Sequence, residues 1–135
     1  MKQKYIDLYM DWAARAAELS HARRLHVGAV IVKDDTVISY GYNGMPAGWD
    51  NNCENYVYNE NNEMSLKTKP EVLHAESNAI AKLAKSTNSG LGADLFVTHS
   101  PCMECSKLIF QSGIRRVFYA EDYRDDAGIK FLKLS

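Results

Sequence analysis

The sequence has little cysteine and proline, three of each among 135 residues, and no apolar run approaches the length of a membrane span. Three cysteines are too few for the disulfide framework of a small secreted domain, which leaves metal binding, catalysis or simple packing as their uses. The charged residues nearly balance, giving a formal net charge of −1. This balance provides no broad field toward nucleic acid or an anionic membrane, so we expect neither as a partner.

The length and composition are those of one globular domain. A chain of this size with 46% hydrophobic residues can bury a sizeable core, and we expect a single domain over residues 1–135. The first residues, "MKQKYIDLYMDW", lack the apolar segment of a secretory signal. We therefore expect a cytoplasmic protein.

Hydrophobic periodicity predicts alternating helices and strands after a first amphipathic helix. The predicted helices cover residues 3–20, 74–86, 101–112 and roughly 125–134. The predicted strands cover residues 27–32, 36–43, 93–99 and 115–121. Residues 44–70 are polar and rich in asparagine, without a sustained period. We interpret them as one long loop, which in a compact domain usually has a function.

The order of these elements indicates the fold class. Alternating strands and helices favour parallel strands that are joined by right-handed crossovers and covered by helices on both faces. The first two strands form a hairpin, which adds an antiparallel part. We expect a three-layer α/β/α sandwich around a mixed sheet of about five strands. The two central helices are expected to follow neighbouring parallel strands, so that their N-termini meet at one edge of the sheet.

Potential metal ligands stand at the starts of these two helices. His74 and Glu76 open one helix, and Cys102 and Cys105, which follow Pro101, open the next. The cysteines are three positions apart, so both sulfurs face the same way, and a helix N-terminus favours the thiolate form. One imidazole and two thiolates suit zinc and leave a fourth tetrahedral position for water. Glu76 is placed to face that water without being a ligand.

Each part of this pattern also has a simpler interpretation. A lone C-x-x-C in a cytosolic protein is more often a redox pair, half of a structural zinc site or a chance occurrence. A lone histidine is more often a surface or core residue than a ligand. The ordered combination is far more specific, because H-x-E…P-C-x-x-C is the signature of the zinc nucleobase deaminases.

Further stretches between residues 27 and 124 match one family within that group. They are "VGAVIV", "GYNGMPAG", "HAESNAI", "SPCMECSKLI", "QSGIRRVFY" and "YRD". With these, the whole chain resembles the deoxycytidylate (dCMP) deaminases of the cytidine deaminase superfamily, and its composition resembles phage-encoded members. Members of the family usually continue past the final helix into another strand, whereas this sequence ends at "FLKLS".

The resemblance implies a hydrolase that converts dCMP to dUMP and ammonia and so supplies thymidylate synthesis. Zinc held by His74, Cys102 and Cys105 would lower the pKa of its water. Glu76 would take a proton from that water and pass it to N3 of the ring. It would then help to protonate the departing amine.

The superfamily pattern also implies contacts to the pyrimidine and the sugar. The amide N–H of Ala75 would donate to the ring O2, and the carbonyl of Ser100 would accept from the 4-amino group, with Pro101 beside it in the substrate site. Asn43 of "GYNG" matches an asparagine that holds the sugar or the pyrimidine.

For the 5′-phosphate the resemblance implies basic and hydroxyl groups. The matching residues are Ser20, Arg24 and Arg124. Simple solvation of the arginines is a serious alternative. Tyr123 either packs on the nucleotide or belongs to the core.

Two further residues resemble ligands but are interpreted otherwise. Cys53 has no other cysteine or histidine near it between residues 44 and 70, so an unliganded thiol is favoured over a second zinc site. His99 is interpreted as ordering the loop before Pro101.

The resemblance finally implies regulation. It suggests a homohexamer activated by dCTP and inhibited by dTTP, with Mg²⁺ accompanying the triphosphate. We place part of that regulatory site at the start of the long loop, where glycine and proline shape backbone that can approach phosphates closely. A plain lid is an equally physical interpretation. The residues in question are Tyr42, Gly44, Met45, Pro46 and Gly48.

Two other functions stay open. The chain is either a deaminase of another nucleoside, base or tRNA, or a non-enzymatic interaction module stabilised by zinc. A tRNA enzyme would need an extended basic surface, which the net charge does not suggest. A structural zinc site would have no need of Glu76.

Overall fold

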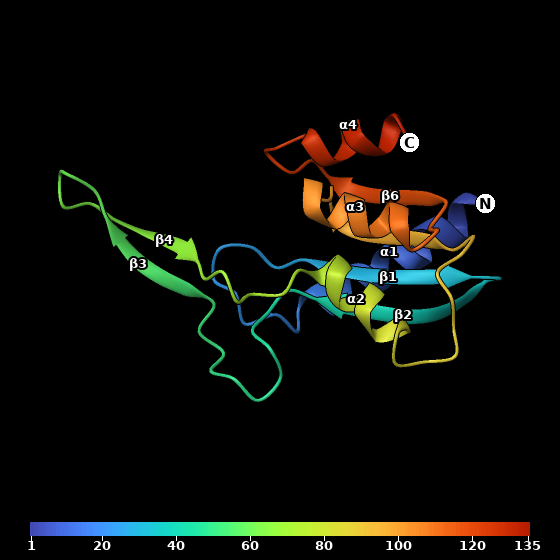
Figure 1. Cartoon of the computed structure of the whole chain (residues 1–135), viewed down its shortest axis with the longest axis horizontal. Coiled ribbons are helices and arrows are strands. Elements are labelled where there is room, and N and C mark those ends of the chain that lie inside the picture. The colour runs from blue at the N-terminus through green and yellow to red at the C-terminus, as the bar shows by residue number, and fades with distance from the viewer.

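The computed structural model describes all residues from 1 to 135 and contains one main sheet flanked by helices (Figure 1). The sheet has four strands in the order β2-β1-β5-β6. Their bounds are β1 Gly28–Lys33, β2 Thr36–Tyr42, β5 Asp94–His99 and β6 Arg116–Glu121. The predicted fold class, a mixed sheet with helices on both faces, is confirmed. The sheet has four strands where about five were expected, because no strand follows the last helix.

The helices form the two outer layers of the sandwich. They are α1 Gln3–Ala17, α2 Ala75–Leu83, α3 Met103–Gln111 and α4 Ala127–Lys133. Helix α1 packs on one face of the sheet, while α2 packs on β1 and β2 from the other face and contacts α3. No helix is long and apolar enough to cross a membrane.

Successive side chains of β1 point to opposite faces of the sheet, and each face is covered by a helical layer. Val30 and Val32 pack against α1, whereas Ala29 and Ile31 join the core beneath α2 and α3. All four are buried. Successive side chains of a strand point to opposite faces, so an uninterrupted apolar run such as this one requires cover on both sides.

The strand directions differ from the prediction in one respect. Strand β1 pairs antiparallel with both β2 and β5, and only β5 and β6 are parallel neighbours. Strands β2 and β5 therefore run in the same direction with β1 between them. The prediction that α2 and α3 follow neighbouring parallel strands was wrong. The N-termini nevertheless meet at one edge, because α2 lies over β1 and β2 and reaches α3.

The segment predicted as one long loop contains a second, two-stranded sheet. Strands β3, Glu54–Tyr58, and β4, Met64–Thr68, pair antiparallel, and this hairpin projects away from the main body in Figure 1. The signal for β3 is the β-forming run "NYVY", which the surrounding asparagines concealed. Asn59 closes the turn, since its Oδ1 accepts from the N–H groups of Asn61 and Glu63.

The last helix is fastened close to the start of α3. A Cβ added at Gly128 would overlap the carbonyl oxygen of Pro101 and would lie 2.6 Å from Ser106 Oγ and 2.7 Å from the carbonyl carbon of Cys102. Backbone thus packs on backbone at this contact, which only glycine permits.

Candidate active site

The ends of two loops bring the predicted metal ligands together. His74 immediately precedes α2 and Cys102 immediately precedes α3, and both have extended backbone. Cys105 lies one turn further along α3, and its N–H donates to Cys102 Sγ over 3.5 Å. The two sulfurs and the imidazole therefore come from adjacent helix N-termini.

The spacing of the three ligand atoms fits a small tetrahedral ion. His74 Nδ1 lies 3.3 Å from Cys105 Sγ and 3.6 Å from Cys102 Sγ, and the three atoms lie within 4.8 Å of one another. A tetrahedral zinc ion at the usual bond lengths to nitrogen and sulfur would hold such a pair about 3.6 Å apart. The donor chemistry and the spacing both suit zinc.

The two thiols differ in their protonation. Hydrogen bonds from the Cys105 thiol and the His74 imidazole hold the pKa of the Cys102 thiol well below its usual range. The same bond to Cys102, together with burial, raises the pKa of Cys105. One thiolate is thus already favoured beside the imidazole, and a bound cation would stabilise the second.

Glu76 provides a carboxyl group beside these ligands. Its side chain is buried and lines the same cavity, and burial raises its pKa to about 7. A carboxyl group with that pKa can both accept and donate a proton near neutral pH, as general acid–base chemistry requires.

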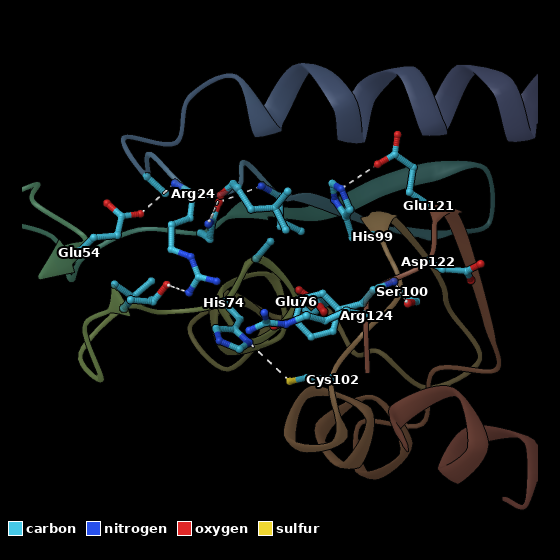
Figure 2. Close-up of a pocket in the computed structure, with 18 residues that line it drawn as sticks. Arg24, Glu54, His74, Glu76, His99, Ser100, Cys102, Glu121, Asp122 and Arg124 are labelled. Atoms are coloured by element: carbon cyan, nitrogen blue, oxygen red, sulfur yellow. Dashed lines mark hydrogen bonds and ion pairs between the residues drawn. The ribbon is translucent and has the colours of Figure 1, made fainter. Parts of the chain in front are cut away.

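His74, Cys102 and Glu76 line a cavity of about 430 Å³, and Cys105 is buried behind them (Figure 2). Residues from both ends of the chain line it, and most residues predicted for substrate binding are among them. Those residues are Arg24, Asn43, Ala75, Ser100, Tyr123 and Arg124, together with His74, Glu76 and Cys102.

The family to which this site belongs follows from sequence comparison. The family model described as the cytidine and deoxycytidylate deaminase zinc-binding region matches residues 3–121. The chain belongs to this deaminase family. It is an enzyme of that family, and the matched region includes the three predicted ligands and Glu76.

The chain spans about half the length of one relative and most of the length of two others. ComE operon protein 2 of Bacillus subtilis is 43% identical over 101 residues, which are 75% of this chain and 51% of that protein. The deoxycytidylate deaminase of Mycobacterium phage D29 is 38% identical over 122 residues, 86% of this chain and 94% of that one. The dCMP deaminase of cyanophage S-TIM5, solved in complex with dCMP and dUMP, has a TM-score of 0.89 and 41% identity and covers 99% of this chain and 93% of that one.

Two residues of the cavity lining each have a backbone group without a hydrogen-bond partner in the chain. The N–H of Ala75, in the first turn of α2, and the carbonyl of Ser100 take part in no hydrogen bond. Ser100 itself is held in place, since its N–H donates to the Glu121 carbonyl over 2.9 Å and its Oγ accepts from the N–H of Tyr123 over 2.6 Å. Pro101 is fully buried and does not line the cavity.

Asn43 connects the cavity to the segment before β1. Its Oδ1 accepts from the N–H of Val27 and its Nδ2 donates to the carbonyl of Leu25. An amide retains one hydrogen and one lone pair beyond these two bonds. Ser20, predicted near the phosphate, does not line the cavity, because its hydroxyl donates to the Asn43 carbonyl and accepts from the N–H of Ala22.

The two arginines predicted for the phosphate both line the cavity, one from the segment before β1 and the other from the segment after β6. Figure 2 shows the side chains of Arg24 and Arg124 pointing into the pocket. Both side chains are exposed, so they stay in contact with water in the pocket. Tyr123 is half-buried beside Arg124 and lines the cavity too.

The residues predicted for regulation flank Asn43 but are not themselves part of the cavity lining. They are Tyr42, Gly44, Met45, Pro46 and Gly48. Gly44 exchanges two backbone hydrogen bonds with Leu73, so this segment is tied to the loop that leads into His74. Gly48 has φ of +86°, which favours glycine.

Several residues of the cavity wall were not predicted. His99 lines it and pairs through Nε2 with Glu121 over 3.0 Å, so it is not one of the clustered ligands. Glu54 and Thr68, from the unpredicted hairpin, line it as well. The hairpin carries no sequence motif. Glu54 differs from the other acidic residues near it only by being buried, and burial cannot be seen in the sequence. Cys53 is a buried free thiol outside the ligand group.

Proposed function

We propose that this enzyme deaminates dCMP to dUMP and ammonia. The observation that carries the proposal is one cavity lined by His74 and Cys102 of the His–Cys–Cys group, by Glu76 and by two arginines. The first two suit hydrolysis of an amino group on a pyrimidine, and the arginines suit a 5′-phosphate. The named relatives from Mycobacterium phage D29 and cyanophage S-TIM5 support the choice of dCMP.

His74, Cys102 and Cys105 would hold the zinc ion, which supplies a Lewis acid that makes water acidic at neutral pH. Glu76 takes a proton from the attacking water and delivers it to N3 of the ring, which makes C4 electrophilic. Once the water oxygen has bonded to C4, Glu76 takes the remaining proton from the new C4 hydroxyl and donates it to the amine; the C4–N bond breaks, the C4 carbonyl forms and ammonia leaves.

The free backbone groups orient the ring for this attack. The N–H of Ala75 donates to O2 of the pyrimidine, and the carbonyl of Ser100 accepts from the 4-amino group. Asn43 offers its remaining amide hydrogen to the sugar or ring. Pro101 keeps the Ser100 carbonyl in position from its buried place behind the cavity.

Arg24 and Arg124 bind the 5′-phosphate, with Tyr123 beside them. A guanidinium presents paired donors to phosphate oxygens, and each hydrogen bond to a charged group is worth about 1.5–3 kcal/mol. The exposed position of both side chains places their contribution at the lower end of that range.

Regulation and assembly complete the proposal. The enzyme is a homohexamer in which dCTP with Mg²⁺ activates and dTTP inhibits, and the segment from Tyr42 to Gly48 forms part of the effector site. The support is the Gly44–Leu73 bridge, which links that segment to the loop before His74. We place the enzyme in the cytoplasm, the host's if a phage encodes it, because three free cysteines suit a reducing compartment.

The decisive experiment measures ammonia release from a panel of substrates with the zinc-loaded enzyme. The panel contains dCMP, deoxycytidine, cytosine, an adenine nucleotide and tRNA. We expect dCMP to have the highest kcat/KM. A preference for deoxycytidine or tRNA would overturn the substrate, and no ammonia from any member would overturn the proposed activity.

A further inference from the structure

The stem of the β3–β4 hairpin reaches the cavity at one specific place. Arg23 and Arg24 lie in the segment between α1 and β1, and their side chains take different directions. Arg24 lines the cavity, whereas Arg23 contacts the hairpin, donating to the Oδ1 of Asn52 over 2.9 Å and to the hydroxyl of Tyr56 over 3.0 Å. One arginine thus lines the cavity while its neighbour ties the segment to the hairpin.

Glu54, the first residue of β3, is the centre of this attachment. Its side chain is 0% exposed, and its carboxylate accepts from the N–H of Arg23 over 2.9 Å, the N–H of Arg24 over 3.1 Å and Nε of Arg23 over 3.4 Å. Burial raises its pKa, but these donors outweigh burial and hold the pKa below its usual value. The carboxylate is therefore charged and fully engaged with this one segment.

The same rung of the hairpin touches the other end of Arg24. Glu54 and Thr68 are register partners in the β3–β4 pair, and Nη1 of Arg24 donates to Thr68 Oγ1 over 3.4 Å. The hairpin thus holds the backbone N–H of Arg24 through Glu54 (Figure 2) and its guanidinium through Thr68. Fixing a long side chain in advance removes part of the entropy cost of binding.

We propose that the Glu54–Thr68 rung of the hairpin determines specificity for a 5′-phosphorylated substrate by positioning Arg24. Glu54 is a positioning residue that acts through Arg24 and does not touch the phosphate. Its charge does not repel the ligand, since Arg23 and two backbone N–H groups neutralise it at close range. This inference rests on the proposed function, because it assigns a structural cause to the phosphate preference.

The test compares kcat/KM for dCMP and for deoxycytidine in Glu54→Gln, Arg24→Ala and the double variant. The amide of Glu54→Gln keeps the shape but loses the charge that orders the segment. We expect a fall of about tenfold in the dCMP-to-deoxycytidine ratio, mostly through a higher KM for dCMP, with zinc content unchanged. In the Arg24→Ala background, Glu54→Gln should lower the ratio no further, because it acts through the missing side chain.

Two further variants provide a control and a substitute for Glu54→Gln. Glu63→Gln makes the same change on the exposed turn of the same hairpin and should leave both substrates unaffected. Arg23→Gln breaks the same ion pair from the Arg23 side chain, which is 43% exposed, and leaves the buried Glu54 unchanged. This variant replaces Glu54→Gln in the test if Glu54→Gln fails to fold. It should lower the ratio in the same direction.

The outcomes separate this inference from the proposed function. Equal losses on both substrates, or additive effects in the double variant, would overturn the positioning role while wild-type preference for dCMP still stands. A wild-type enzyme that prefers deoxycytidine would overturn the dCMP assignment and this inference together.

Discussion

His74 Nδ1 lies 3.3 Å from Cys105 Sγ, although 31 positions of sequence separate the two residues. The first belongs to the start of α2 and the second to the first turn of α3, so the contact depends on both helices and on the sheet beneath them. A ligand pair assembled from distant segments is fixed by the whole fold.

Replacing either cysteine of this group should remove the metal. In Cys102→Ser and Cys105→Ser the hydroxyl group stays protonated and is a poor zinc ligand, so we expect zinc content and activity to fall together. Metal analysis of the purified variants measures this. Cys53→Ser is the matched control, since Cys53 is the third free cysteine and lies outside the ligand group. Full zinc occupancy in either ligand variant would show that the ligand set is wrong.

Glu76→Gln should separate catalysis from metal binding. The amide cannot carry protons, so we expect turnover to fall by about a hundredfold or more while zinc content and the folded state are retained. Ammonia release and metal analysis on the same sample give both values. Glu104→Gln, an exposed acid in the first turn of α3, is the control. Substantial turnover in a zinc-loaded Glu76→Gln enzyme would exclude the acid–base role.

Arg124→Ala should discriminate between a nucleotide and a nucleoside. Loss of a phosphate contact lowers kcat/KM for dCMP by about tenfold or more, and affects deoxycytidine much less. Arg15→Ala, on the exposed face of α1 where Arg15 pairs with Glu18, controls for the loss of a surface charge. If both substrates suffer equally, Arg124 supports the fold and not the phosphate.

Asp94 should make stability depend on pH at the acid end. Burial raises the pKa of its carboxyl, but the guanidinium groups of Arg116 and Arg115 outweigh burial and hold that pKa below its ordinary value. A depressed pKa contributes stability that is present above the unfolded-state pKa, about 3.9, and is lost as the pH falls through the folded value. We expect Asp94→Asn to cost about 1–3 kcal/mol at pH 7.

Denaturant unfolding as a function of pH measures this contribution. The gap between wild type and Asp94→Asn should stay constant at neutral pH and close below about pH 4. Glu18→Gln, which breaks only a surface pair, should differ little from wild type at any pH. A gap that persists unchanged in acid would mean that the Asp94 side chain contributes by shape and not by charge.

The proposed regulation predicts the form of the kinetics. The rate should depend on dCMP in a sigmoidal manner, dCTP with Mg²⁺ should make the curve hyperbolic, and dTTP should suppress the rate, as two global states with different effector affinities require. Initial rates at a series of dCMP concentrations measure all three. Hyperbolic kinetics that neither triphosphate alters would remove the regulatory proposal and leave the catalytic one intact.

Local sequence patterns were sufficient for the elements of the main body. The period of α1 and the apolar run of β1 reflect burial against immediate layers, and burial of that kind leaves a repeating pattern in the sequence. His74, Glu76 and the two cysteines were predicted because their chemistry is conveyed by spacing within single helix starts.

Contacts between distant polar residues could not be predicted in this way. The β3–β4 hairpin projects from the main body, so its strands have no buried face and hence no clear alternation. The link from Glu54 to Arg23 and the pair between His99 and Glu121 join segments that approach only in the folded chain. A hydrogen bond of that kind leaves no periodic trace in either partner.

The backbone contact at Gly128 joins the final helix to the segment that carries Cys102. Since α4 presses on the carbonyl groups of Pro101 and Cys102, the docking of α4 and the binding of an ion restrict the same few backbone torsions. By thermodynamic linkage, each then favours the other to the same extent. Chelation should therefore accelerate amide hydrogen exchange in α4, a helix that contributes no ligand, and metal should slow it again.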